Sequence, residues 1–227
     1  AAPKRRSRTE PPAMAEPASL AFANLPNPSS TAIPMATTTA AAARSLAVPP
    51  AHPPPTCWAS PPFSPSDAAE LAELGGRTFR ATYVADTPMN VLEAYIRRQF
   101  GVAQQLAELA DPAFQTLVAE RGGVLIGYAM LHVSAPPIDT VADATIQMSR
   151  LYVDASEQGR GVGDALFVGA LDLAQRDGHH QMWLTVWERN VRAIAVYRRW
   201  GFADVGHVAF DLAGEMQTDR VLVGRIS

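Results

Sequence analysis

The most informative part of the sequence is residues 144–163, which read ATIQMSRLYVDASEQGRGVG. Residues 144–153 are rich in apolar and β-branched side chains and predict a strand, and residues 163–177 predict a helix that stops at Gly178. Between them lies a glycine-rich turn, residues 158–163. A strand that runs through glycines into a helix N-terminus directs unpaired backbone N–H groups at one spot, where the helix dipole adds positive potential. The stretch therefore predicts an anion site suited to a phosphate or a pyrophosphate.

Known glycine motifs match this turn only in part. A dinucleotide-binding turn needs G-x-G-x-x-G early in a βαβ unit, and no glycine stands at its sixth position here. A P-loop needs Gly-Lys-Ser/Thr, which is absent. A tight turn with a purely structural role also fits, so the turn alone leaves its ligand open.

The hydrophobic pattern around the turn predicts a mixed α/β domain. Helices are expected from Asp67, with a bend at Gly75-Gly76, from Pro88 to Gly101, and over residues 102–109. The other expected elements are strands over 114–119, 124–133 and 181–187, a helix over 190–200, and a final hairpin of strands over 205–212 and 220–226.

Proline is distributed very unevenly along the chain. Of the 19 prolines in 227 residues, 15 lie between Pro3 and Pro65, and no acidic residue occurs between Glu16 and Asp67. Such a segment buries too little apolar area to offset its ordering entropy. We therefore expect a disordered Pro/Ala-rich tail over residues 1–65 and a globular domain over residues 66–227.

Charge and cysteine content exclude several classes of protein. The net charge is −3, divided into +3 for the expected tail and −6 for the expected domain, which argues against a nucleic-acid partner. A single cysteine, Cys57, allows neither an internal disulfide framework nor a cysteine metal cluster. No apolar run approaches the ~18 residues of a membrane span, and no secretory apolar core is found, so a cytoplasmic protein is expected.

The turn occurs together with other residues in a recognisable order. Asn190, Ala193, Tyr197 and Gly201-Phe202 follow it. Together they resemble the GCN5-related N-acetyltransferase (GNAT) family, over about residues 66–226. The resemblance implies an α/β fold with a mixed, mostly antiparallel sheet, splayed between two central parallel strands and flanked by helices. It also implies acetyl-CoA as cosubstrate. The placement of the histidines, with His179-His180 on a turn and single residues on strands, separately argues against a metal site.

In that family acetyl-CoA lies where the two parallel strands separate, here near Val153 and Trp187. Its pyrophosphate would rest on backbone N–H groups of the turn, and its pantetheine arm would pair along the strand. A backbone N–H near Leu151 would stabilise the oxyanion. The cofactor-binding residues implied are Leu151, Tyr152, Val153, Gln158, Gly159, Arg160, Gly161, Val162, Gly163 and Asn190.

The resemblance also implies catalytic roles. Tyr197 matches the family's general acid, with core packing as the alternative, and Asn190 could equally be a helix N-cap. In many relatives the base is an acid on the strand before the turn, but that position holds Gln147, whose amide cannot accept a proton. Glu188 is the best remaining carboxylate and Asp154 a weaker one, while deprotonation through water would need neither.

The implied activity is transfer of an acetyl group to a primary amine by direct attack. The acceptor is expected to be a small molecule, with a polyamine-like amine as one class. A non-catalytic acyl-CoA-binding sensor or interaction module is the alternative, which Gln147 favours, whereas Tyr197 and Asn190 favour the enzyme. We expect no nucleic-acid or membrane partner and leave a homodimer open.

The family's first strand would fall near residues 56–63. Pro61-Pro62 would interrupt a ladder there. Either a short edge strand forms around Cys57-Trp58, or the sheet begins one strand short.

Overall fold

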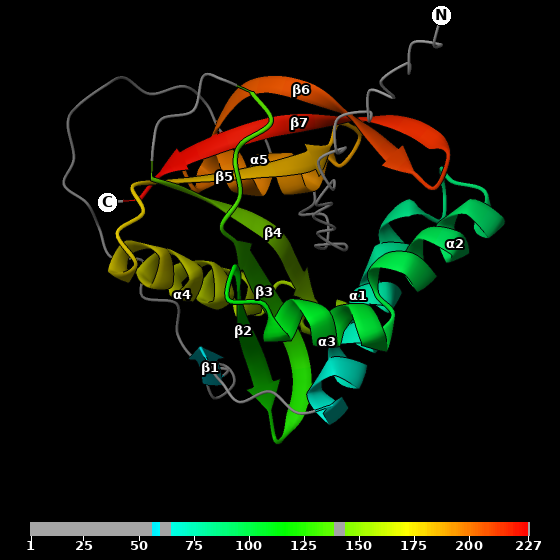
Figure 1. Cartoon of the computed structure of the whole chain (residues 1–227), viewed down its shortest axis with the longest axis horizontal. Helices are drawn as coiled ribbons and strands as arrows, with labels where there is room; N and C mark the ends of the chain where they lie inside the picture. The colour runs from blue at the N-terminus through cyan, green and yellow to red at the C-terminus, as the bar shows by residue number, and fades with distance from the viewer. Residues whose placement is uncertain (1–55, 60–64, 139–143, 227) are drawn as a thin grey trace, which may run out of the picture.

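A computed structural model of the chain describes residues 56–59, 65–138 and 144–226. These residues form a seven-stranded sheet in the order β1-β2-β3-β4-β5-β7-β6, with helices on both faces (Figure 1). The strands are β1 (Thr56–Ala59), β2 (Phe114–Arg121), β3 (Val124–His132), β4 (Thr145–Val153), β5 (Gln181–Trp187), β6 (Ala203–Leu212) and β7 (Glu215–Arg225). The helices are α1 (Pro65–Tyr83), α2 (Met89–Gln99), α3 (Val102–Ala110), α4 (Val162–Arg176) and α5 (Val191–Arg199), with a short 3-10 turn η1 (Ala155–Glu157).

Strands β4 and β5 form the parallel pair of the sheet, and every other neighbouring pair is antiparallel. Their pairing runs from Thr145 opposite Gln181 only as far as Gln147 opposite Trp183. Beyond that point the two strands diverge, as Figure 1 shows. The expected mixed sheet, splayed between two central parallel strands, is confirmed.

Two hydrophobic cores lie on opposite faces of the sheet. One joins α4 and α5 to strand residues such as Leu117, Ala129 and Leu151. The other joins α1 and α2 to strand residues such as Val118 and Tyr128. Except at β-bulges, the side chains alternate between the two covered faces of the sheet.

Helix α1 runs without interruption through Gly75-Gly76, where the sequence predicted a bend. A Cβ built on Gly75 would lie 2.6 Å from both the Phe100 ring and the Tyr128 hydroxyl. Glycine therefore lets α1 approach α2 and the sheet closely, and packing offsets its low helix propensity.

A β-bulge in β4 changes which face its side chains occupy. Met130 pairs with Arg150, whereas Leu131 pairs with Met148, so Ser149 is the extra residue. The Ser149 hydroxyl donates a hydrogen bond of 3.0 Å to the Met130 carbonyl. Because a bulge shifts the alternation by one residue, Arg150 lies on the same face as Gln147.

The sheet has a short first strand. β1 pairs antiparallel with β2, from Thr56 opposite Glu120 to Ala59 opposite Leu117. The first of the two alternatives for this segment is therefore correct, and the sheet begins upstream of residue 66. The rest of the predicted tail, residues 1–55 and 60–64, lies outside the described residues.

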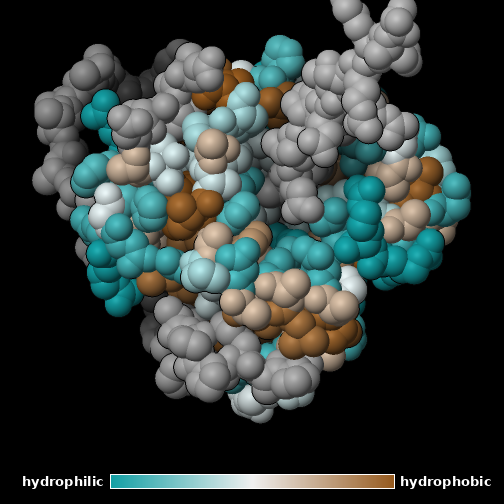
Figure 2. All heavy atoms as spheres, in the orientation of Figure 1, coloured by the Kyte–Doolittle hydropathy of each residue, from teal (hydrophilic) through white to brown (hydrophobic). Residues whose placement is uncertain are grey.

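Helix α3 buries polar side chains and exposes apolar ones. Gln105 and Glu108 are buried, whereas Val102 and Leu106 are exposed. Figure 2 shows apolar residues gathered on the surface over α3. The cause is Arg150, which projects from β4 toward the inner face of α3 and requires polar partners there.

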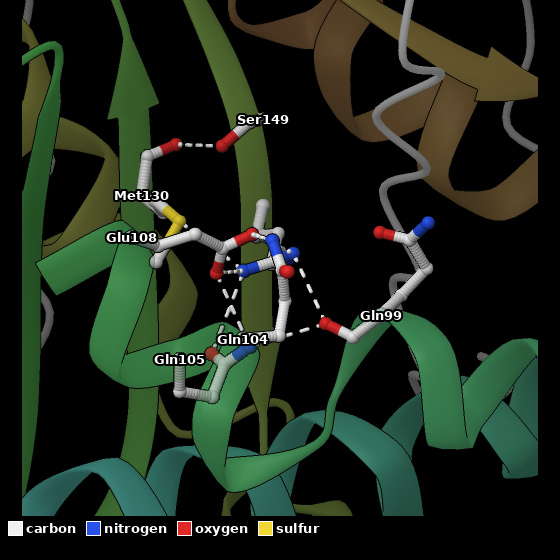
Figure 3. Close-up of polar contacts among 7 residues, drawn as sticks. Gln99, Gln104, Gln105, Glu108, Met130 and Ser149 are labelled. Carbon is white, nitrogen blue, oxygen red and sulfur yellow. Dashed lines mark hydrogen bonds and ion pairs between the residues drawn. The ribbon is translucent and has the colours of Figure 1, made fainter. Parts of the chain in front are cut away.

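Arg150 and Glu108 form a buried ion pair with two parallel hydrogen bonds. Figure 3 shows Glu108 within its network of polar contacts, next to Gln104 and Gln105. The guanidinium nitrogens Nη1 and Nη2 lie 2.5 and 2.7 Å from the two Glu108 oxygens. The amides of Gln104 and Gln105 donate further hydrogen bonds to the same carboxylate, at 3.0 and 3.1 Å. This satisfied network fixes α3 against the sheet.

We expect Glu108→Gln to lower the free energy of unfolding by about 3–5 kcal/mol, because it leaves the Arg150 charge buried without a counter-ion. Urea unfolding at neutral pH measures this loss. The double variant Glu108→Leu/Arg150→Met should recover most of it. The control is Glu73→Gln, which breaks the exposed pair between Glu73 and Arg77 and should cost less than about 1 kcal/mol. Equal losses in the two single variants would contradict the prediction.

Candidate functional site

The larger of two relevant cavities lies on the α2 and α3 side of the sheet, and we call it the aromatic pocket. Its volume is about 550 Å³. Strands β3 to β7 form one wall and helices α2 and α3 the other. Its lining residues are Tyr95, Gln99, Phe100, Glu108, Phe114, His132, Ser134, Ala135, Pro137, Gln147, Ser149, Arg150, Trp183, Thr185, Val208, Ala209, Phe210 and Asp219.

A second cavity of about 240 Å³, the turn pocket, lies at the glycine-rich turn. Its lining residues are Val153, Gln158, Gly159, Gly161, Gly163, Asp164, Val196, Arg199 and Trp200. Strand β4 thus reaches both cavities, with its middle in the aromatic pocket and its end in the turn pocket.

The turn has the geometry of an anion site. Gly161 is the N-cap of α4 with φ +81°, and its cap has no side-chain hydrogen bond. Gly159 also has a positive φ, +74°. A Cβ built on Gly161 would have no heavy atom within 4 Å, so the space beside the N-cap of α4 is open. A pyrophosphate fits this arrangement, since the N–H groups and the helix dipole both attract negative charge.

The other turn residues have distinct positions. The Gln158 amide donates a hydrogen bond of 3.1 Å to the Val153 carbonyl, which ties the turn to β4. The Val162 side chain is buried in the core, so only its backbone faces the turn. Arg160 is half exposed and lies 3.6 Å from Glu157. Arg199 of α5, which sequence reasoning missed, is the arginine that lines the turn pocket.

The predicted strand residues lie beyond the last β4–β5 pair. Leu151 and Val153 are buried in the core under α4 and α5, and Tyr152 is buried in the opposite core. Within the described part of the sheet, no ladder joins the backbone of residues 148–153 to β5. Backbone groups that face this gap can therefore pair with an extended ligand.

Asn190 is the N-cap of α5. Its side-chain oxygen accepts a hydrogen bond of 3.1 Å from the Ala193 N–H. Its amide nitrogen Nδ2 is buried and has no hydrogen-bond partner among the residues that the structure describes. The N-cap role is thus present, and a donor remains for a ligand.

Tyr197 is fully buried in the core between α5 and the sheet. Its ring packs against Trp200 and Phe202, with centroid separations of 5.9 and 5.8 Å. It lines neither the aromatic pocket nor the turn pocket. Burial, together with the neighbouring Tyr152, raises the pKa of the Tyr197 hydroxyl far above its ordinary value, so the phenol holds its proton at neutral pH.

The predicted base Glu188 is exposed at the end of β5, outside the aromatic pocket, and its backbone N–H donates to the Thr218 carbonyl at 3.1 Å. The weaker candidate Asp154 is held by Ser156 and Arg77. Partial burial acts to raise the pKa of Asp154, but the hydrogen bonds from Ser156 and Arg77 outweigh it and lower the pKa. Asp154 is therefore a poor base. Gln147 does line the aromatic pocket, where it accepts a hydrogen bond of 2.8 Å from Ser134.

Asp219 of β7 is an ionisable residue of the aromatic pocket to which the sequence analysis assigned no catalytic role. It is fully buried, with a register position opposite Trp187 on β5 and Val208 on β6. Burial raises the pKa of its carboxyl to about 7. The signal was present in the strand: Asp219 shares its face with Val221 under the two-residue alternation that predicts inward positions.

Membrane spans and metal clusters are both absent from the part of the chain that the structure describes. No helix in the described ranges combines the length and apolarity needed to cross a bilayer. Across the same ranges, no group of three His, Cys, Asp or Glu side chains is placed to hold a metal ion.

Comparison with known proteins agrees with this geometry. Residues 78–202 match the model of the acetyltransferase (GNAT) family. An uncharacterized N-acetyltransferase of Mycobacterium tuberculosis is 29% identical over 158 residues, which cover 70% of this chain and 97% of that protein. The spermine/spermidine N(1)-acetyltransferase of Bacillus subtilis is 27% identical over 90 residues, 39% of this chain and 59% of that protein.

A solved structure shares the fold. The PaiA N-acetyltransferase of Thermoplasma acidophilum, in complex with coenzyme A, superimposes with a TM-score of 0.62 at 19% identity, over 76% of this chain and 99% of that chain. The family match covers more than half of the chain, and the splayed sheet agrees with it. The chain therefore belongs to the acetyltransferase (GNAT) family.

Proposed function

We propose that this N-acetyltransferase transfers the acetyl group of acetyl-CoA to a small primary amine by direct attack. The observation that carries the proposal is the gap between β4 and β5, which opens after Gln147 and Trp183. The turn pocket and the aromatic pocket both border β4, one for an anionic ligand and one for an acceptor. Acetyl-CoA supplies an activated acyl group when bound, so an amine can attack without a covalent enzyme intermediate.

We assign the donor side of the site to the turn and its neighbours. Backbone N–H groups from Gln158 to Gly163 hold the pyrophosphate, with Arg199 adding positive charge from α5. The backbone from Leu151 to Val153 pairs with the pantetheine arm, and an N–H near Leu151 stabilises the oxyanion. Asn190 Nδ2, buried without a partner among the described residues, supports its assignment as a further cofactor contact.

Tyr197 is assigned as the general acid that protonates the departing thiolate. Its raised pKa keeps the phenol protonated, which a proton donor requires. The acceptor side is assigned to the aromatic pocket. The similarity to a spermine/spermidine N(1)-acetyltransferase supports an amine as acceptor and makes polyamines one class to test.

The purified full chain should release free CoA thiol from acetyl-CoA when a primary amine is added. A panel of small primary amines, with thiol detection and mass spectrometry of the acetylated product, measures this. Tight CoA binding without thiol release for any amine would overturn the enzymatic proposal.

Gly161→Ala should weaken CoA binding by about tenfold, or 1.4 kcal/mol, because a Cβ enters the open space at the N-cap of α4, where the pyrophosphate is assigned. Isothermal titration of CoA measures it. Gly178→Ala is the matched control: Gly178 has the same φ of +81° and the same open surroundings, but lies at the far end of α4. Both variants should lose about 1–2 kcal/mol of stability from left-handed strain, and only the first should lose affinity. Equal affinities would count against the turn as the pyrophosphate site.

Tyr197→Phe should lower kcat by about 10²-fold, because the leaving thiolate loses its proton donor, and should leave CoA affinity unchanged. The control is Tyr128→Phe, another fully buried tyrosine, on β3, which should keep the wild-type rate. If Tyr197→Phe retains full rate across the pH range, Tyr197 serves in core packing instead.

A further inference from the structure

The aromatic pocket contains a carboxylate that the donor side does not use. Asp219 lies on β7, and its register position opposite Trp187 and Val208 puts it on the strand face that lines the pocket. It is fully buried, and both carboxylate oxygens are inaccessible to solvent. A buried acid in a ligand-sized cavity is a candidate functional group, because its ionised form is costly to desolvate.

Asp219 has no ion-pair partner among the described residues. The Thr185 hydroxyl hydrogen-bonds the carboxyl and lowers its pKa, but by less than burial raises it, and Thr185 brings no positive charge. The other acid of the pocket, Glu108, is fully engaged by two hydrogen bonds from Arg150. When Asp219 ionises, its charge is therefore the uncompensated charge of the pocket, and a ligand cation is the partner that would balance it.

The surroundings of Asp219 suit a proton acceptor that works near neutral pH. Burial raises the pKa of its carboxyl to about 7, while Thr185 opposes the shift and the Glu188 charge adds to it. A base is most effective when its pKa lies near the working pH. The other ionisable groups around it are Tyr95 of α2, Glu108 of α3, His132 of β3 and Arg150 of β4, which line the pocket, and Glu188 at the end of β5.

The walls of the pocket restrict the body of the amine. Five aromatic rings, from Tyr95, Phe100, Phe114, Trp183 and Phe210, line it. A polyamine would bring further ammonium groups into this apolar space. Among the described residues that line the pocket, the other carboxylate, Glu108, already pairs with Arg150 and cannot balance them. An unpaired buried cation is strongly unfavourable, whereas an apolar chain or ring gains from burial.

We propose that Asp219 binds the ammonium group of the acceptor and removes its proton, and that the acceptor is a monoamine with an aromatic or aliphatic body. This inference rests on the N-acetyltransferase activity proposed above. It transfers the role of base from Glu188, which is exposed outside the pocket, to a carboxylate that lines the same pocket as Gln147.

The atoms and electrons of this reaction balance. The ammonium gives one proton to an Asp219 oxygen, and the nitrogen lone pair forms a bond to the thioester carbonyl carbon while the π pair moves to oxygen. The carbonyl re-forms, the C–S bond breaks, and its electron pair leaves on sulfur, which takes the proton of Tyr197. The second proton lost by nitrogen restores Tyr197, and Asp219 returns its proton to solvent. Ammonium and thioester thus give amide, thiol and one proton.

The acceptor class is tested with the full chain, acetyl-CoA and matched amines: 2-phenylethylamine and hexylamine against putrescine, spermidine and spermine. The monoamines should show kcat/KM at least about tenfold above the polyamines. A preference for spermidine or spermine would overturn the monoamine assignment. No thiol release with any of them would defeat the underlying N-acetyltransferase proposal instead.

The role of Asp219 is tested with Asp219→Asn, which keeps the shape of the side chain. It should lower kcat/KM for the best monoamine by about 10²-fold and leave CoA affinity unchanged. Wild-type kcat/KM should rise with pH through about 7, following ionisation of Asp219, and the variant should lack this rise. Glu215→Gln, an exposed carboxylate on the same strand, is the control and should behave as wild type. If Glu188→Gln removes the rise and Asp219→Asn keeps it, Glu188 is the base and the proposal fails.

Thermal unfolding shows whether the variant remains folded. The pKa of Asp219 rises from 3.8 to about 7 on folding, so the native state holds a proton that the unfolded state has released. The stability due to this group is present at low pH and is lost as pH rises through that window. Asp219→Asn should therefore have a higher Tm than wild type at pH 8 and the same Tm at pH 3. A lower Tm at pH 8 would show that Asp219 has a stabilising partner, against the proposal.

Discussion

The separation of β4 from β5 is the constraint on which the rest of the structure depends. Two neighbouring parallel strands normally pair along their length, but here pairing ends after Gln147 and Trp183. The backbone beyond that point needs other partners, because buried N–H and C=O groups are costly when unpaired. Helices α4 and α5 cover one side of the gap and α1 and α2 the other. The extended ligand proposed above would pair with this backbone.

The same separation divides the site between two faces. The glycine turn, the end of β4 and α5 form a region suited to an anion, whereas the middle of β4, β5 and β7 form a pocket walled by aromatic rings. The bulge at Ser149 links the two, since it turns Arg150 toward α3 and leaves Leu151 and Val153 in the opposite core. Ser149 itself lines the aromatic pocket, and the strand beyond it reaches the turn pocket at Val153.

The features that could be predicted from the sequence depend on local chemistry. The turn from Gln158 to Gly163 was recognisable because several glycines at a helix start favour close backbone approach to a ligand, and the Asn190 cap because its side chain serves the adjacent helix. The inward polar face of α3 could not be predicted: its apolar periodicity indicates the opposite orientation, and only the distant Arg150 reverses it. The role of Asp219 was missed for a related reason: its alternation with Val221 indicates an inward position, but the cavity at that position is built by distant elements.

In the aromatic pocket, the same burial affects both which acceptor binds and how readily Asp219 accepts a proton. The desolvation that raises the pKa of Asp219 comes from the same burial that favours an apolar acceptor. Glu108 shows the alternative in the same cavity: a buried carboxylate whose oxygens accept hydrogen bonds from Arg150 and from two glutamine amides. Glu108 and Asp219 differ because of their hydrogen-bond partners and not because of burial, since both acids are buried to a similar degree. Glu108, which pairs with Arg150, has a structural role. Asp219, which has no cation partner among the described residues, can bind an ammonium group and accept its proton.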